Sequence, residues 1–368
     1  MRYVLLKILA RFNTVLLIYG SADVFGFLST KKDLLRLIDL CPFLASEKRS
    51  YDNSAVLALL RKNPRAACLR HSFRCGIGNT NKVHPLAMVV ALGGSMDVVE
   101  LMVRACPEAL DEKLSGKRTV LHYAIAEGVD VEIIQYLTSQ NPSLVSEVDS
   151  FQAIPLHLAA TYPSSSTDVL CYLLRVHPAG VKSLDHRSQT PLHRACKSRA
   201  SLDKVLALIE FNPEALFWTD WERNSTPRGW AERIEHRLSD PIDEIVDILL
   251  IVEEILTMGS NNADVEREEC QRDAQRILMH FISIEWWGGI HMAFSRNIRL
   301  ASLLSVPMGL FPELLSLVGR GGDNVIDASS CSCDNDNNDG GEDGPLLKIR
   351  MECVFSVLIQ CPDAVGFT

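Results

Sequence analysis

A short motif recurs along this chain at a nearly constant interval. Its clearest copy is Thr190–Cys196, which reads TPLHRAC, and related copies begin near residues 154, 119 and 84. A weakened copy, which keeps the threonine, the proline and the alanine, begins at Thr226, so that successive copies are 35 or 36 residues apart. A fixed step of this length indicates a chain of repeated supersecondary units that pack on their neighbours, in place of one central core.

Proline supplies a second, independent marker of the same interval. The four prolines Pro107, Pro142, Pro178 and Pro213 are separated by 35, 36 and 35 residues, and each follows an apolar pattern of helical period. Proline lacks an amide hydrogen and keeps the preceding residue out of helical geometry, so each should lie just beyond a helix end. The pattern predicts helices over Ser95–Cys106, Asp130–Asn141, Thr167–His177 and Leu202–Asn212.

These motifs resemble the T-P-L-H-x-A signature of the ankyrin repeat. The Asn-Pro-Glu-Ala type of ending, in place of the usual glycine turn, is similar to divergent ankyrin repeats of unicellular algae. The resemblance implies an all-α solenoid of paired antiparallel helices with short hairpin-like connectors. In the connectors, Gln152 and Ser188 stand where the family usually has glycine. We therefore expect hairpins that are less regular than those of the family.

The repeat pattern divides the chain unevenly. Ankyrin repeats are predicted for 83–259, with starts near 84, 119, 154, 190 and 226. The flanking segments are an apolar N-terminal segment at 1–30, divergent repeat helices with an inserted loop at 31–82, a helical insertion or eroded repeats at 260–306, and a divergent C-terminal repeat at 307–368 with an acidic, disordered loop at 328–345.

Three histidines, one in each clear repeat, invite a catalytic or metal-binding interpretation. Their regular spacing favours a structural role, because a residue present in every repeat serves the repeat. The resemblance implies that the histidine ring ties the turn backbone of its own and the adjacent repeat. The signature residues with this structural role are Thr119, Leu121, His122, Ala124, Pro155, Leu156, His157, Ala159, Thr190, Pro191, Leu192, His193 and Ala195.

The remaining chemistry-bearing segments give little support for an enzyme. No phosphate-binding loop, nucleophile elbow, zinc-protease motif or dinucleotide fingerprint occurs in the chain. The acidic tract 334–343 resembles a calcium loop, but neither possible register places Asp, Gly and Glu together at the positions that an EF-hand requires. We therefore expect a non-enzymatic protein with no cofactor and no metal, and keep a cation-responsive regulator as the alternative.

Charge and cysteine usage bear on partners and compartment. A net charge of −9 argues against a nucleic-acid partner, since such proteins usually carry a clustered basic face. Eleven cysteines cannot all pair within the chain, and a reducing compartment fits them best, so a cytoplasmic location is expected. The first 22 residues contain basic but no acidic residues, which leaves organelle targeting as the alternative. No stretch is long and apolar enough to predict a membrane span.

The resulting hypothesis is a scaffold or adaptor that binds another protein on the concave face of the repeats. The sequence identifies neither that partner nor the oligomeric state. Mixed charges and aromatic side chains suit a protein partner. By repeat position alone, the predicted contact residues at the hairpin tips and on the first helices are Arg118, Tyr123, Phe151, Tyr162, Arg187, Arg194, Lys197 and Trp221.

Overall fold

The structure is a computed structural model, and it describes residues 33–42, 44–73, 82–235 and 243–257 together with 277, 280–281, 284, 286 and 288–289. The chain divides into two compact units, Met1–Gly180 (unit 1) and Val181–Thr368 (unit 2). Each unit is described by itself.

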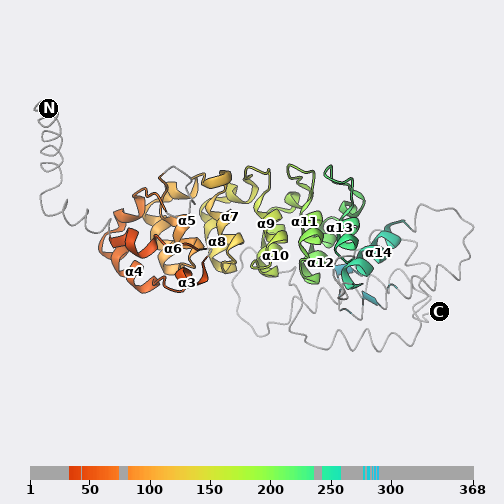
Figure 1. Ribbon diagram of the computed structural model, residues 1–368, viewed down its shortest axis with the longest axis horizontal. Helices are drawn as coiled ribbons and strands as arrows, with labels where there is room; N and C mark the ends of the chain where they lie inside the picture. Colours follow the sequence, from red (N-terminus) through yellow and green to blue (C-terminus); the bar gives the residue numbers. More distant parts are fainter. Residues whose placement is uncertain are drawn as a thin grey trace, which may run out of the picture. The chain divides into compact units, whose positions relative to one another are not determined.

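Unit 1 consists of helix pairs separated by short 3₁₀ helices (Figure 1). Residues 33–38 are also helical. The α-helices are α3 (Ala45–Lys48), α4 (Asn53–Lys62), α5 (Leu86–Ala91), α6 (Met96–Ala105), α7 (Val120–Ala126), α8 (Val131–Gln140), α9 (Pro155–Thr161) and α10 (Thr167–Val176). The 3₁₀ helices are η1 (Pro64–Cys68), η2 (Pro107–Leu110), η3 (Ser115–Lys117), η4 (Pro142–Ser146) and η5 (Pro178–Lys182), the last of which crosses into unit 2.

The helices of unit 1 lie in two rows. The first helices of successive repeats, α5, α7 and α9, contact one another, and the second helices α4, α6, α8 and α10 form the other row. Each second helix buries a stripe at three-to-four spacing, such as Val98, Val99, Met102 and Val103 in α6. The predicted second helices are confirmed to within one residue at each end.

The prolines that follow the second helices do more than end them. In each repeat the proline is the first residue of a 3₁₀ helix of four or five residues, where its missing amide hydrogen is not needed. The residue before it, for example Cys106 or Asn141, has a non-helical backbone and donates its amide hydrogen to the last turn of the helix. The sequence predicts a helix end at this place, and the 3₁₀ helix is an additional element.

Unit 2 repeats the same pairing (Figure 1). Its helices are α11 (Pro191–Ser198), α12 (Leu202–Phe211), η6 (Pro213–Phe217), α13 (Pro227–Glu235) and α14 (Asp243–Thr257). Helix α11 packs on α13, and α12 packs on both α11 and α14. The weakened motif that begins at Thr226 therefore still forms the first helix of a repeat, with α14 as its partner.

An aspartate side chain closes the hairpin in front of each of three first helices. The Oδ1 atom of Asp149 accepts hydrogen bonds from the amides of Phe151 (2.8 Å) and Ala153 (3.0 Å). In unit 2, Asp185 accepts from Arg187 (2.8 Å) and Gln189 (2.9 Å) in the same way. Asp220 accepts from Arg223 (3.2 Å) and Ser225 (3.0 Å), across a hairpin that is one residue longer. The carboxylate thus satisfies amide groups that no strand would pair.

The hairpins are regular in spite of the missing glycines, which corrects the expectation from sequence. Gln152 and Ser188 have φ of 56° and 57°, the left-handed conformation that glycine adopts without strain. The backbone bonds across the two hairpins are both 3.0 Å long, from Asp149 N to Ala153 O and from Asp185 N to Gln189 O. The bonds to the aspartate therefore impose the conformation on residues that do not favour it.

The signature histidines are fully buried and bridge backbone groups. The Nδ1 atom of His122 accepts from the amide of Thr119 (3.2 Å), and its Nε2 lies 3.1 Å from the carbonyl oxygen of Ala153 in the next hairpin. His193 has the same arrangement with Thr190 (3.3 Å) and Trp218 (3.0 Å). Burial, the largest cause, lowers the pKa of His122 to about 4, so the ring is neutral at neutral pH. The geometry supports the structural role for these histidines.

Some of the sequence predictions lie wholly or mainly outside the described residues. These are the N-terminal segment 1–30 with its targeting alternative, the segments 260–306 and 307–368, and the acidic loops 328–345 and 334–343. The inserted loop in 31–82 is described only at its ends, where His71 and Val83 exchange two backbone hydrogen bonds of 2.8 Å. Among the described helices, none is both long and apolar enough to cross a membrane.

Glycine at the left-handed positions should stabilise the protein. Because a non-glycine residue at positive φ carries strain, we expect Gln152→Gly and Ser188→Gly each to raise the free energy of unfolding by about 1 kcal/mol. Ser150→Gly, at an exposed neighbour without positive φ, is the matched control and should not stabilise. Urea unfolding followed by circular dichroism measures all three variants, and a stabilising effect of Ser150→Gly alone would contradict the strain argument.

The buried histidines should make the fold sensitive to acid. The pKa of His122 is about 4 when folded and 6.5 when unfolded, so the unfolded chain binds more protons between these values. The contribution of the neutral ring is complete above about pH 6.5 and is lost as the pH falls towards 4, at up to about 1.4 kcal/mol per pH unit.

We expect His122→Asn to be less stable than the parent at neutral pH and to lose less stability on acidification. The control is His177→Asn, which places at a half-buried histidine the residue that other repeats carry there. Unfolding curves at several pH values test this prediction. An unchanged pH slope in His122→Asn would show that the proton uptake occurs elsewhere.

Candidate functional site

The predicted contact residues of unit 1 differ in how accessible they are. Phe151, at the tip of its hairpin, is half exposed, and Tyr162 is partly exposed at the end of α9. Arg118 lies with Nε 3.6 Å from Oδ2 of the buried Asp149. Tyr123 is only 6% exposed, which rules it out as a surface contact. The reason is its place in α7, which packs between α5 and α9 and buries nearly its whole length.

In unit 2 the predicted contact Arg194 is largely committed to an internal ion pair. Its guanidinium binds Oδ2 of Asp185 through Nε (2.8 Å) and Nη2 (2.7 Å). Burial pushes the pKa of Asp185 upward, but the amides of Gln189 and Arg187 and the charge of Arg194 outweigh it and hold that pKa below its ordinary value. Arg194 therefore stabilises the hairpin, and little of its charge remains for a partner.

The next repeat replaces this arginine with a tryptophan. Trp230 occupies the same place in its motif that Arg194 has in the preceding one, four residues after the threonine. Its Nε1 donates to Oδ2 of Asp220 at 2.9 Å, and Gln189 Nε2 donates to the same oxygen at 2.7 Å. The buried aspartate is thus satisfied without a cation. The arginine and lysine side chains nearby therefore do not pair with Asp220.

Three of these cations surround the ring of Trp230. The Nζ atom of Lys197 lies 4.2 Å from the ring centroid, and the guanidinium carbons of Arg223 and Arg233 lie at 5.3 and 5.8 Å. These distances are within the range of cation–π attraction. Both arginines are exposed, whereas the ring is only 7% exposed. The ring thus positions charges that would otherwise move freely in solvent.

One carboxylate lies among these cations. Glu222 Oε2 accepts from Lys197 Nζ at 2.8 Å and from Arg187 Nη1 at 2.9 Å. The hydrogen bond from Lys197 is the largest cause that lowers the pKa of Glu222 below its ordinary value. Because it is shared by two cations, this carboxylate orients both of them without neutralising the positive charge of the group.

Trp221 is the most exposed large hydrophobic side chain in the part of the chain that the structure describes, at 69%. It is nevertheless held in place. Its Nε1 donates to the carbonyl oxygen of His186 at 2.9 Å, and its amide donates to that of Arg187 at 3.1 Å. A tryptophan whose polar atoms are satisfied internally presents a rigid apolar surface, which costs little side-chain entropy when a partner covers it.

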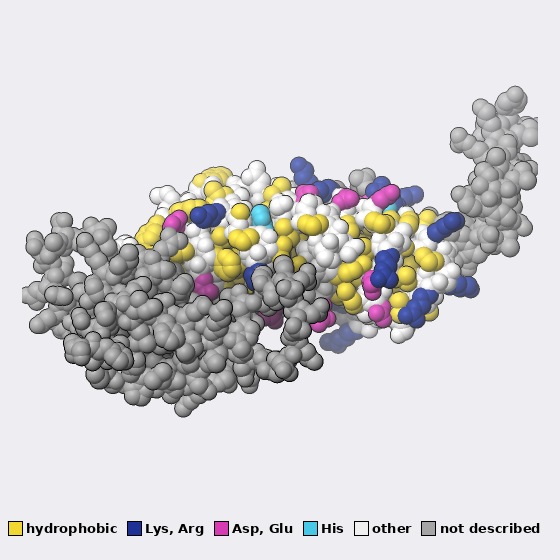
Figure 2. All heavy atoms as spheres, turned by 180° about the vertical axis from the view of Figure 1, so that it is seen from behind, with side chains coloured by type: hydrophobic (Ala, Val, Ile, Leu, Met, Phe, Trp, Pro, Cys, Tyr) yellow, Lys and Arg dark blue, Asp and Glu magenta, His cyan; other side chains and the backbone are white. Residues whose placement is uncertain are grey.

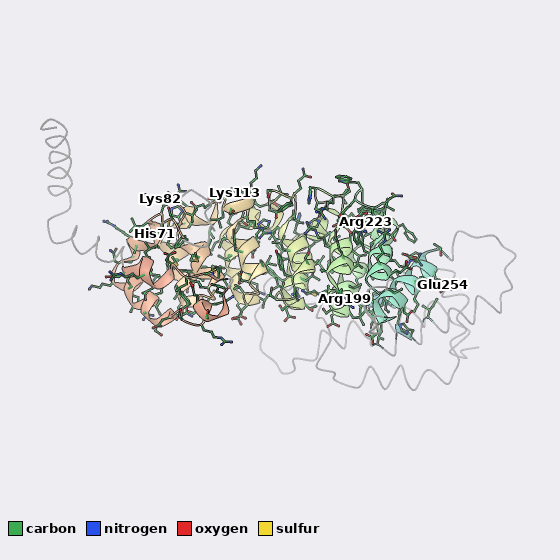
Figure 3. All side chains as sticks on the ribbon, viewed as in Figure 1. His71, Lys82, Lys113, Arg199, Arg223 and Glu254 are labelled. Carbon is green, nitrogen blue, oxygen red and sulfur yellow. The ribbon has the colours of Figure 1, made fainter. Side chains whose placement is uncertain are left out.

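These residues form one continuous surface through the contacts just described. We call it the tryptophan–arginine surface and define it by Arg187, Lys197, Trp221, Arg223, Trp230 and Arg233. Figure 3 shows Arg223 near the edge of unit 2 where the hairpins lie, and Arg199 lower, at the end of α11. On the face seen in Figure 2, the described part of the chain mixes hydrophobic and charged side chains.

Arg187, Lys197 and Trp221, which repeat position predicts as contact residues, lie together in the structure. Repeat position predicts neither Arg233 nor the role of Trp230. The available signal is the departure of Trp230 from the repeat motif, in a position that the motif leaves variable.

The described residues offer no group of three or more histidine, cysteine or carboxylate side chains that could hold a metal ion. The signature histidines use both ring nitrogens for backbone groups where the bonds are resolved, in His122 and His193. The tryptophan–arginine surface presents charged groups, hydrogen-bond donors and apolar side chains.

Comparison with known proteins agrees with this architecture. Residues 86–182 match the family model described as ankyrin repeats in three copies. This range begins with α5 and ends with η5, and unit 2 continues the same helix pairing. No curated protein gives a significant match to the chain. Ankyrin repeats are generally modules of protein–protein interaction. The matched residues and the helix geometry together show that residues 86–182 form ankyrin repeats.

Proposed function

We propose that this chain is a non-enzymatic adaptor that binds an acidic segment of a protein partner on the tryptophan–arginine surface of unit 2. The observation that carries the proposal is the exposed but fixed side chain of Trp221 beside a group of positioned cations. Tryptophan and arginine are the residues most enriched where binding energy concentrates in protein interfaces.

Charge supports the acidic character of the partner. The whole chain has a net charge of −9, yet this surface holds four cations. Arg187 and Lys197 bind the carboxylate of Glu222, and Lys197, Arg223 and Arg233 lie near the ring of Trp230. A positive patch attracts segments of opposite charge, so an acidic segment of a partner suits this surface. Such attraction weakens as salt screens it.

Organisation before binding supports the same conclusion. The cations are held by Glu222 and by the ring of Trp230, and the hairpin that carries Trp221 is closed by Asp220. A partner would therefore bind without first having to order these side chains, which is a main cost of association. A hairpin of this kind at the edge of a repeat gives contact area without disturbing the helices behind it.

Truncation of the exposed ring tests the proposal. The full chain is first used to select binders from a library of displayed random peptides. We expect Trp221→Ala to weaken binding of the selected peptides by at least tenfold, which corresponds to about 1.4 kcal/mol. The fold should persist, because most of this side chain contacts only solvent.

The matched control is Phe211→Ala, which removes another exposed aromatic ring of unit 2, at the end of α12. It should leave affinity unchanged. Arg223→Glu should weaken binding, whereas Arg199→Glu, at an exposed arginine on the end of α11, should not. Peptides that bind equally well to Trp221→Ala and Arg223→Glu would refute this surface, and a failure to select any binder would refute the adaptor function.

A further inference from the structure

Two cysteines of unit 1 meet at the junction between successive repeats. Cys68 is the last residue of η1, and its Sγ donates to the carbonyl oxygen of Ala105 at 3.1 Å. Cys106 is the next residue after Ala105 and caps the C-terminus of α6. The Cys68 thiol is also one of the causes that raise the pKa of Cys106, so the two side chains lie close together. The junction thus brings together two cysteines that are 38 positions apart in the sequence.

The following repeat holds a pair of polar side chains at the corresponding positions. Asp111 lies four residues after Pro107, as Cys68 lies four residues after Pro64, and Asn141 precedes Pro142 as Cys106 precedes Pro107. In that repeat, Asn141 Nδ2 donates to Asp111 Oδ1 at 2.7 Å. The same pair of positions therefore links two adjacent repeats in both places. In one place the link is a hydrogen bond between polar side chains, and in the other it is a pair of thiols.

The two thiols differ in their exposure to solvent. Cys68 is exposed and can be reached by a small oxidant, whereas Cys106 is only 4% exposed. Burial, followed by the hydrogen bond with Cys68, raises the pKa of Cys106 to about 11. Cys106 is therefore protected from direct attack by bulky reagents but lies within reach of the Cys68 sulfur.

We propose that Cys68 and Cys106 form a reversible disulfide that covalently links two adjacent repeats under oxidising conditions. The oxidant is a small-molecule disulfide. The Cys68 thiolate attacks it, which breaks its S–S bond, forms a mixed disulfide and releases one thiol. The Cys106 thiolate then attacks the Cys68 sulfur and releases the second thiol. Two protein thiols are oxidised to one disulfide, one external disulfide is reduced to two thiols, and the two protons pass to the released thiols.

The link would fix the N-terminal end of the repeats. The disulfide would close a loop over residues 68–106, which includes the insertion between His71 and Val83. This closure would remove many conformations from the unfolded chain. In a reducing compartment the pair stays as two thiols, and the hydrogen bonds of Cys68 hold the junction instead. The site thus responds to the redox state of its surroundings without any other change in the fold.

The test uses the full chain equilibrated with oxidised glutathione at neutral pH. Peptide mapping by mass spectrometry under non-reducing conditions should identify a linked pair that contains Cys68 and Cys106, with the loss of two hydrogen atoms. Addition of excess reduced glutathione should restore both thiols. The oxidised protein should also have a thermal unfolding midpoint several degrees higher than the reduced one.

Two serine variants control the experiment. Cys68→Ser, at an exposed position where the fold should tolerate it, must abolish both the linked peptide and the rise in the midpoint. Cys196→Ser, at a buried cysteine of unit 2, should keep the linked peptide. A parent protein that yields only a glutathione adduct on Cys68, or links Cys68 to several cysteines without preference, would overturn the proposal.

Discussion

The fold depends on a polar interaction inside an apolar stack, the buried histidine that connects one repeat to the next. Nδ1 of His122 accepts a hydrogen bond from the amide of Thr119, and its Nε2 lies within hydrogen-bond distance of the carbonyl oxygen of Ala153. His193 makes the same pair of contacts in unit 2. Both backbone groups are buried and would cost free energy if unsatisfied. The ring achieves this only in its neutral form, since a proton on Nδ1 would face the threonine amide hydrogen. One ring thus fixes a helix start and a hairpin together.

The sequence was sufficient for the parts of the fold that depend on local pattern. The interval between motifs, the second helices and the structural role of the histidines all follow from residues repeated at a constant spacing. The regularity of the hairpins was not foreseen, because Gln152 and Ser188 disfavour the left-handed backbone that the hydrogen bonds at Asp149 and Asp185 impose on them. The burial of Tyr123 was also missed, since only the packing of α7 between its neighbours decides it.

The candidate site shows why function is harder to read from a repeat than fold. Arg194 and Trp230 occupy the same motif position but have different roles. Arg194 forms an ion pair with Asp185, whereas Trp230 donates a hydrogen bond to Asp220, so that the cations nearby do not pair with this aspartate. No property of either residue alone reveals this difference, because it depends on which donor satisfies the buried aspartate. The same reasoning applies to Cys68 and Cys106, whose proximity follows from comparing positions in successive repeats, not from their spacing in the chain.

The aspartate that closes each hairpin also determines how such a protein can change. Because Oδ1 of Asp149 or Asp185 reaches an amide four residues ahead, and Oδ1 of Asp220 one that is five residues ahead, closure does not require a fixed number of residues between them. A residue can be inserted at the tip without moving the helix start behind it. The extra residue before Thr226 is of this kind. Hairpin length is therefore a variable that evolution or a designer can alter independently of the core, and new binding specificities can arise there at little cost in stability.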